Sequence, residues 1–187
     1  MPSDTMFEHR DELASLNGPQ PLLERMEEVH RVIQARHPFV ARVAVALLDE
    51  GTQTLKTYVH SSGRDNPLSN YEAPLEAAPS LGRTIQLRNP RVVNDLSVFR
   101  DGEHLHTVRI WEHGYRASYA LPIFRESRLV AVIFFNSTEA GSFTTEALKD
   151  LDLFGHLIGQ MVFEEQTKFR LLMATLRTAT RMIHQRD

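Results

Sequence analysis

The chain has 187 residues, of which 42% are hydrophobic, and a formal net charge of -3. This length favours one domain plus an extension, and the slightly acidic balance argues against a general nucleic-acid surface. No apolar run approaches the roughly 20 residues needed to span a bilayer, and the N-terminus lacks the pattern of a secretion signal. We therefore expect a soluble, cytoplasmic protein. The absence of cysteine excludes disulfides, thiolate metal sites, thiol nucleophiles and thioether-linked chromophores.

The first part of the chain predicts a lead-in and one helix. Residues 1–18 are polar and show no clear period, so we expect a mobile or helical segment. From Leu22 to Ile33 apolar residues recur at helical spacing, and the prolines at 21 and 38 suit the start and the end of a helix. Its apolar side suits either a sheet or a helical bundle, and the pattern does not decide between them.

The middle of the chain predicts short elements. Residues 40–48 and 55–60 are rich in β-branched and other apolar residues around a polar turn, which predicts an antiparallel hairpin. Residues 61–79 carry several prolines and are expected to form a loop. A short helix over 80–88 and a brief strand over 91–95 follow. The least regular stretch runs from Phe99 to Tyr115.

A second hairpin follows, and it predicts the fold class. Residues 118–124 and 128–136 have strand patterns joined by a tight turn. The second of them is nearly all apolar, as expected for a central strand that is covered on both faces. Antiparallel hairpins with helices before and after them predict an α+β fold, in which a sheet is layered against helices.

From about residue 144 to residue 186 the sequence predicts one long helix. At about 1.5 Å per residue it spans on the order of 60 Å, beyond what one domain of this size covers. Gly155 and Glu165 interrupt the apolar repeat, and such positions fix the register or mark where the helix leaves its own domain. We expect the remaining apolar positions of the repeat to pair two copies as a homodimer with parallel helices, through Ile158, Val162, Phe169, Leu172, Leu176 and Ile183.

The segment from 99 to 118 holds the densest side-chain chemistry, and we expect a small organic ligand there. Arg109 and Arg116 would suit a carboxylate or phosphate through paired N–H donors, whereas Trp111 is equally suited to the core. Expected apolar contacts come from Phe99, Val108, Trp111 and Tyr115, and expected polar contacts from His104, His113, Arg116 and Ser118.

Other chemistries fit this segment less well. His104, His106 or His113 would be the ligands of a metal or haem, but a closed site needs three or four donors and only two lie close in sequence. We therefore expect neither group. No serine sits in a Gly-x-Ser-x-Gly turn, so serine catalysis has no support and we expect no catalytic residue.

The order of these segments resembles a GAF domain. The resemblance rests on residues 80–95, 118–123, 129–133 and 143–146, and it covers roughly residues 22–162. It implies a central antiparallel sheet of five to six strands of the GAF/PAS type. It further implies helices on one face that form a dimer surface, a ligand pocket on the other face, and a regulatory sensor joined to an output domain.

The resemblance also allows special functions of the family to be tested. Bilin-binding members and free methionine sulfoxide reductases of this fold use cysteine, so a covalent bilin and that reductase chemistry are both excluded. Members that bind cyclic nucleotides carry an Asn-Lys, Phe and Asp-Glu signature. Here the corresponding residues are Asn136-Ser137, Phe143 and Ala147-Leu148, which argues against cyclic-nucleotide binding.

The expected organisation is a lead-in at 1–18, a sensory domain at 19–143 and a signalling helix at 144–187. The helical pattern at 175–187 has no stop signal and resembles the lead-in to an HD-GYP output domain, which hydrolyses cyclic diguanylate. A diguanylate cyclase or a histidine kinase is the alternative output. We expect a non-catalytic sensor that relays ligand binding through a dimeric helix. The alternatives are a ligand-free dimerisation module and a haem or metal sensor.

Overall fold

The computed structural model describes residues 8–63, 72–99 and 105–184, and all structural statements below concern these residues. In chain order the elements are η1 (Ala14–Asn17), α1 (Leu22–Arg36), β1 (Val40–Asp49), β2 (Thr54–Ser62), β3 (Glu72–Pro74), η2 (Leu75–Ala77), α2 (Pro79–Leu87), β4 (Arg91–Val93), η3 (Leu96–Phe99), α3 (Leu105–Glu112), β5 (Ala117–Arg125), β6 (Arg128–Ser137) and α4 (Thr145–His184). None of the helices in this part of the chain combines the length and the apolar character that a membrane crossing needs.

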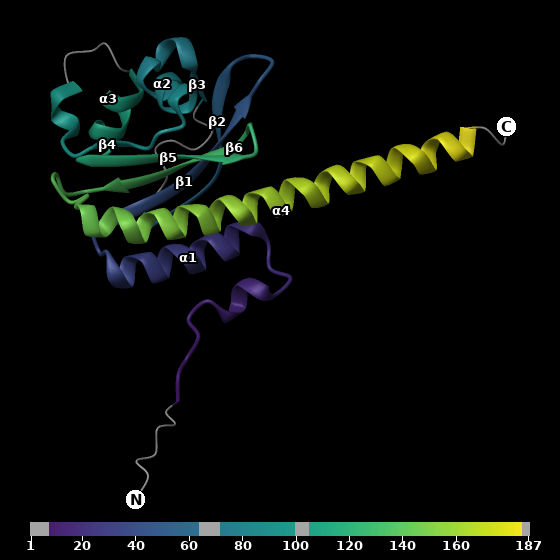
Figure 1. The fold of residues 1–187 in the computed structure, drawn as a ribbon, viewed down its shortest axis with the longest axis horizontal. Coiled ribbons are helices and arrows are strands. Elements are labelled where there is room, and N and C mark those ends of the chain that lie inside the picture. The colour runs from purple at the N-terminus through teal and green to yellow at the C-terminus, as the bar shows by residue number, and fades with distance from the viewer. Residues whose placement is uncertain (1–7, 64–71, 100–104, 185–187) are drawn as a thin grey trace, which may run out of the picture.

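The centre of the fold is a six-stranded antiparallel sheet with the order β3-β2-β1-β6-β5-β4. Figure 1 shows α1 and α4 on one face of this sheet, called the proximal face here, and α2 and α3 on the other, called the distal face. β6 lies between β1 and β5, and both of its faces are covered. The predicted α+β class and the central position of this strand are therefore confirmed.

Strand alternation gives the sheet two different faces. Along β1, Val43 and Val45 point to the proximal core, whereas Ala44 and Ala46 belong to the distal core. The proximal core holds large side chains such as Phe135, since two helices pack there. The distal core is built on alanines and a few larger residues, and the small side chains leave room above the strands.

The sequence left open whether helix α1 packs on a sheet or in a helical bundle. In the structure it does both, because it packs on the sheet and also against α4. Its buried His30 is bonded at both ring nitrogens, with Nδ1 2.8 Å from the Ser61 hydroxyl and Nε2 3.1 Å from the Val40 carbonyl. Burial lowers the pKa of His30, so the neutral ring is favoured. This helix is thereby fixed to the first hairpin.

Helix α4 is 40 residues long and changes environment along its length. Ile158 and Val162 are fully buried against the sheet of their own chain, so their prediction as contacts with a second copy was wrong. The apolar repeat of the first half packs on the sheet instead, because β5 and β6 offer it a large apolar face. Further along, Phe169, Leu172 and Leu176 are more than half exposed on the part that projects from the domain (Figure 1).

Two stretches expected to be irregular contain short elements. The segment 61–79 includes β3 and η2, and the segment 99–115 includes α3, which ends at Glu112 and is followed by Gly114 in the left-handed conformation with φ of 87°. An eight-residue helix shows too few turns for its period to be visible. His106 lies within α3, and His104 lies outside the described residues.

Candidate functional site

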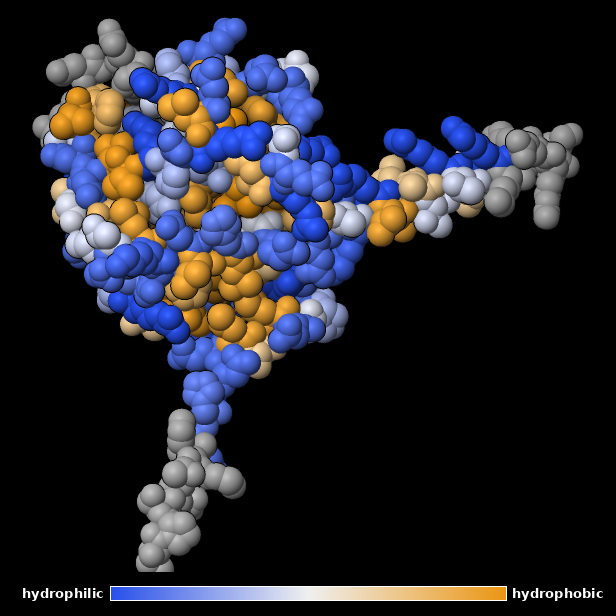
Figure 2. Space-filling model, viewed as in Figure 1, coloured by the Kyte–Doolittle hydropathy of each residue, from blue (hydrophilic) through white to orange (hydrophobic). Residues whose placement is uncertain are grey.

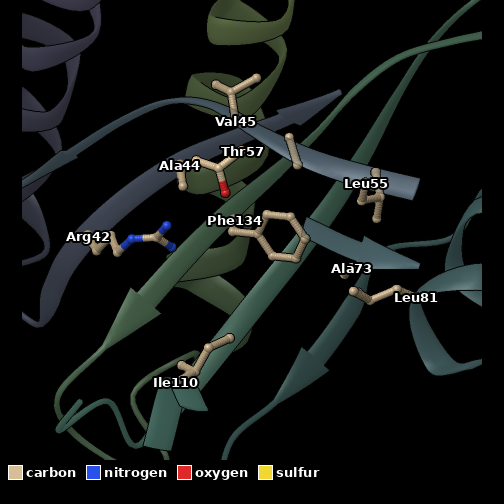
Figure 3. Close-up of a pocket in the computed structure, with 10 residues that line it drawn as sticks. Arg42, Ala44, Val45, Leu55, Thr57, Ala73, Leu81, Ile110 and Phe134 are labelled. Atoms are coloured by element: carbon tan, nitrogen blue, oxygen red, sulfur yellow. The ribbon is translucent and has the colours of Figure 1, made fainter. Parts of the chain in front are cut away.

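The distal face carries an apolar cavity between the sheet and the elements that cover it. Its volume is about 20 Å³, which is room for roughly one water molecule. Figure 3 shows the Phe134 ring at the centre, the Arg42 side chain on one side, and Leu55, Ala73 and Leu81 on the other. The walls are formed by Arg42, Ala44, Val45, Ala46, Leu55, Thr57, Ala73, Leu81, Ile110 and Phe134.

One end of this cavity is polar, because a row of polar residues crosses the sheet there. Arg42 is paired with Asn136 across β1 and β6, and Asn136 with Ser118 across β6 and β5. Arg42 Nη1 donates to Asn136 Oδ1 at 2.8 Å, and Asn136 Nδ2 donates to Ser118 Oγ at 3.0 Å. All three residues are buried. The row holds the guanidinium in a fixed place beside the apolar cavity.

The electrostatics of this end are set by the buried guanidinium. Arg42 is 3% exposed, and burial lowers its pKa to about 10, with the nearby Tyr115 opposing the shift. Arg42 remains charged at neutral pH. Burial lowers the pKa of His60 as well, and the positive charge of Arg42 adds to that effect. The cavity therefore has a positive end and an otherwise apolar wall.

His60 lies on the same face of the sheet, because its register partner in β1 is Ala44. Its Nδ1 atom is buried and has no hydrogen-bond partner among the described residues. A neutral imidazole nitrogen can donate or accept, depending on the tautomer. His60 is thus a second polar group on the side of the cavity where Arg42 lies.

The predicted ligand residues of the 99–118 segment form the cover at this end rather than the wall of the cavity. Tyr115 is buried in a cluster with Val93, Leu96 and Ile110, and Phe99 and Trp111 pack against that cluster. Only Ile110 of α3 reaches the cavity wall. Val108 is half-buried and His113 is exposed. His104 is outside the described residues, and Ser118 belongs to the polar row.

Arg116 has a structural position in the same cover. Its Nη1 donates to the backbone carbonyls of Trp111 and Tyr115, at 3.1 and 3.0 Å, and its guanidinium lies 5.1 Å from the centre of the Trp111 ring. Carbonyl acceptors and an aromatic face satisfy a guanidinium well. Arg116 therefore holds the end of α3 on the start of β5.

Sequence reasoning missed Arg42 and Phe134, which line the cavity, and His60, which lies on the same face of the sheet. One signal for Arg42 was present, because it is the single charged residue in the apolar run 40–48. A charged residue inside a strand that is covered on both faces is unusual unless it has a specific role. Nothing comparable marks Phe134, which is one apolar residue among many in β6.

The chemistry of this site favours binding over catalysis. Fixed hydrogen-bond donors at one end of an apolar cavity are the usual arrangement for holding a small molecule in one orientation. In the described part of the chain, no three His, Cys, Asp or Glu residues are grouped in a way that could hold a metal ion.

Comparison with known proteins gives one family and a set of related folds. The family model described as GAF domain matches residues 25–162. None of the curated proteins matches this chain.

Solved structures of similar fold have low sequence identity to this chain. The GAF domain of Acinetobacter phosphoenolpyruvate-protein phosphotransferase is 13% identical with a TM-score of 0.62, covering 83% of this chain and 90% of that one. The GAF domain/HD domain protein of Geobacter sulfurreducens is 12% identical with a TM-score of 0.61, covering 80% and 97%. The type II free methionine-R-sulfoxide reductase of Thermoplasma acidophilum is 15% identical with a TM-score of 0.57, covering 76% and 93%.

Proposed function

Because this chain belongs to the GAF domain family, we propose that it is a non-catalytic sensory domain that binds a small molecule in the distal cavity and relays binding through α4. The ligand contacts are Arg42, Asn136 and the walls of the cavity. Further contacts come from the predicted residues when the cavity opens, namely Phe99, His104, Val108, Trp111, His113, Tyr115, Arg116 and Ser118.

The observation that carries this proposal is that β5 joins the polar row beside the cavity to the long helix. On its distal face, Ser118 belongs to the polar row and Ala120 to the distal core. On its proximal face, Tyr119 bonds to Asp152 of α4, and Leu121 and Ile123 lie directly under α4. A strand that bonds to the polar row on one face and to α4 on the other couples the row to the helix without any further element. A coupling of about 1–3 kcal/mol changes an output roughly 5- to 150-fold.

The proposed relay needs a second copy of the chain. The projecting part of α4 exposes apolar residues that no element of its own domain covers, and two parallel copies would bury them. We place the dimer interface at Phe169, Leu172, Leu176 and Ile183.

We propose that an output domain follows α4. An HD-GYP phosphodiesterase for cyclic diguanylate is our first choice. Its support is the fold similarity to the Geobacter protein that carries a GAF and an HD domain, together with the resemblance of residues 175–187 to an HD-GYP lead-in. The cytoplasm, where cyclic diguanylate is made and degraded, is the compartment that this proposal implies.

Ligand binding is tested by thermal shift against a panel of metabolites and nucleotides. A compound that raises the melting temperature is expected to lose its effect in Arg42→Met and to be weakened in Trp111→Ala. Val98→Ala is the control, because Val98 is 70% exposed on η3 and should leave the effect unchanged. A stabilising compound that acts equally on wild type and Arg42→Met would contradict the assigned site.

The relay is tested by distance measurement on α4. The chain has no cysteine, so one cysteine introduced at the exposed Ala174 gives a single spin-labelled position in each copy. Electron resonance should give one inter-copy distance distribution, and a bound compound should shift or narrow it. Binding without any change in this distribution would exclude α4 as the relay.

A second candidate function is a ligand-free dimerisation module. The small volume of the cavity favours it, because about 20 Å³ admits no metabolite without rearrangement. This candidate predicts that no compound of the panel stabilises the protein while the dimer still forms. The first candidate predicts at least one compound with an effect that depends on Arg42.

A further inference from the structure

The charge in the cavity restricts the class of ligand that the proposed function requires. Arg42 is the one charged residue that lines the cavity in the described part of the chain. Its guanidinium is buried and keeps its positive charge at neutral pH. An arriving anion would stabilise the guanidinium, whereas a cation would be repelled. The planar N–H fork of arginine matches a carboxylate in particular.

His60 also favours a polar ligand head group at the end of the cavity where Arg42 lies. It shares the distal face with Arg42, and the charge of Arg42 acts on its pKa, so the two groups are close. Its buried Nδ1 has no hydrogen-bond partner in the described ranges. A head group with several oxygen atoms would bond Arg42 and give the imidazole a partner. A purely apolar ligand would leave this nitrogen unbonded, which is costly in a buried place.

The rest of the cavity indicates a flat apolar body. Ala44, Ala46 and Ala73 line it and expose little more than a methyl group each, so a planar group can lie close above the strands. The Phe134 ring already occupies this position, as Figure 3 shows. The present free volume of about 20 Å³ is too small for a second ring. A ligand ring therefore has to take the place of the Phe134 ring, which turns aside.

We infer that the distal cavity takes a small carboxylate with a flat, mostly aromatic body, held by Arg42 at its carboxylate and by the alanines at its ring. This inference rests on the proposed function, because it names the ligand class of the same site. Phe134 is the residue that opens and closes the site. Its ring fills the cavity in the absence of ligand, so the closed form described above is the expected unliganded state.

The test is titration calorimetry of the full chain with two matched pairs of compounds. Benzoate is compared with benzamide, and indole-3-acetate with indole-3-acetamide, on wild type and on Phe134→Ala. Each acid should bind at least about tenfold more tightly than its amide, because a charged hydrogen-bonded pair is lost in the amide. Indole-3-acetate should bind Phe134→Ala about tenfold more tightly than wild type, since no ring has to be displaced.

Two arginine variants identify the group that selects the acid. Arg42→Met keeps an unbranched side chain but removes the charge, and it should remove the preference, so that acid and amide bind alike. Arg128→Met removes the same charge from the exposed start of β6 and should keep the preference. If Arg42→Met does not fold, as judged by circular dichroism, the comparison of acid and amide on wild type and Phe134→Ala still decides the inference.

The possible failures separate the ligand class from the proposed function. Equal binding of acids and amides by wild type and Phe134→Ala overturns the carboxylate class and leaves a sensor for neutral molecules. If none of the four compounds binds to either protein, the carboxylate class is also overturned. The proposed function is overturned only if, in addition, no compound of the metabolite panel raises the melting temperature. A preference for acids that survives in a folded Arg42→Met overturns the assignment to Arg42.

Discussion

At the scale of single residues, Tyr119 makes the most informative contact. It is 1% exposed, stacks on Phe135 with ring centres 5.7 Å apart, and its hydroxyl donates to Asp152 of α4. Burial raises the pKa of Tyr119, and the hydrogen bond to the Asp152 carboxylate raises it further. The neutral phenol is thus favoured in the folded protein well above its ordinary pKa of 10.0.

Substitution of Tyr119 by Phe should lower the free energy of unfolding by about 1–2 kcal/mol, because one buried hydrogen bond is lost. In the unfolded chain Tyr119 ionises near pH 10, whereas in the folded protein it stays protonated, so rising pH favours unfolding above pH 10. The difference between wild type and Tyr119→Phe should be constant below that pH and shrink above it. Urea unfolding at a series of pH values measures this, and a difference that grows above pH 10 would contradict it.

At the scale of elements, α4 lies unusually close to β5. Gly155 faces the Leu121 side chain, and a Cβ at Gly159 would lie 2.7 Å from Ile123 Cγ2. A β-branched side chain in a strand cannot move far from its backbone, so Ile123 gives way less easily than Leu121. Gly155 interrupts the apolar repeat of the helix for this reason. The two glycines set the distance between the strand beside the cavity and the proposed relay helix.

Gly159→Ala should therefore destabilise the protein although alanine is the better helix former. Overpacking costs about 1–3 kcal/mol, against a gain of about 1 kcal/mol from helix propensity. Adding Ile123→Ala should give a favourable interaction energy between the two substitutions, because the smaller strand residue removes the clash. Urea unfolding of the double-mutant cycle measures both effects. Gln160→Ala on the exposed side is the control, and stabilisation by Gly159→Ala would refute the close contact.

At the scale of the whole molecule, the projecting part of α4 has an uncovered apolar side. Phe169, Leu172 and Leu176 are 62%, 57% and 51% exposed. Figure 2 shows the apolar residues of this part gathered along one side of the helix, with hydrophilic residues along the other. An isolated helix with an uncovered apolar side is only marginally stable in water. In the proposed dimer, the same helix of a second copy would cover this side and hold the two proposed output domains together.

The double substitution Leu172→Glu and Leu176→Glu should convert the dimer into a monomer, because it places four like charges into the proposed interface. Sedimentation velocity at micromolar concentration measures the change. Circular dichroism should show an intact sheet, since neither residue touches the domain core. Ala174→Glu is the matched control on the outer side of the helix and should stay dimeric. A wild-type chain that sediments as one copy would disprove the dimer and the relay together.

Several features could be predicted from the sequence because their signals are local. The strands β1, β5 and β6 and the helices α1 and α4 each carry an apolar period over enough residues to be seen. The short β3 and α3 lack that length and were missed. In the candidate site, Ser118 was predicted as a ligand contact and lies in the polar row. Arg42, His60 and Phe134 were not predicted, because a strand pattern does not show which residues meet across a sheet.

The sequence by itself determined the α+β class, the GAF resemblance and the long terminal helix, because composition and periodicity follow from the order of residues alone. The tertiary structure decided which face of α4 is used by its own sheet, since Ile158 and Val162 have the same apolar character as Leu172 and Leu176. It also decided where the charge of the cavity lies. Arg42 and Asn136 are 94 residues apart in the chain, and only the pairing of β1 with β6 brings them together.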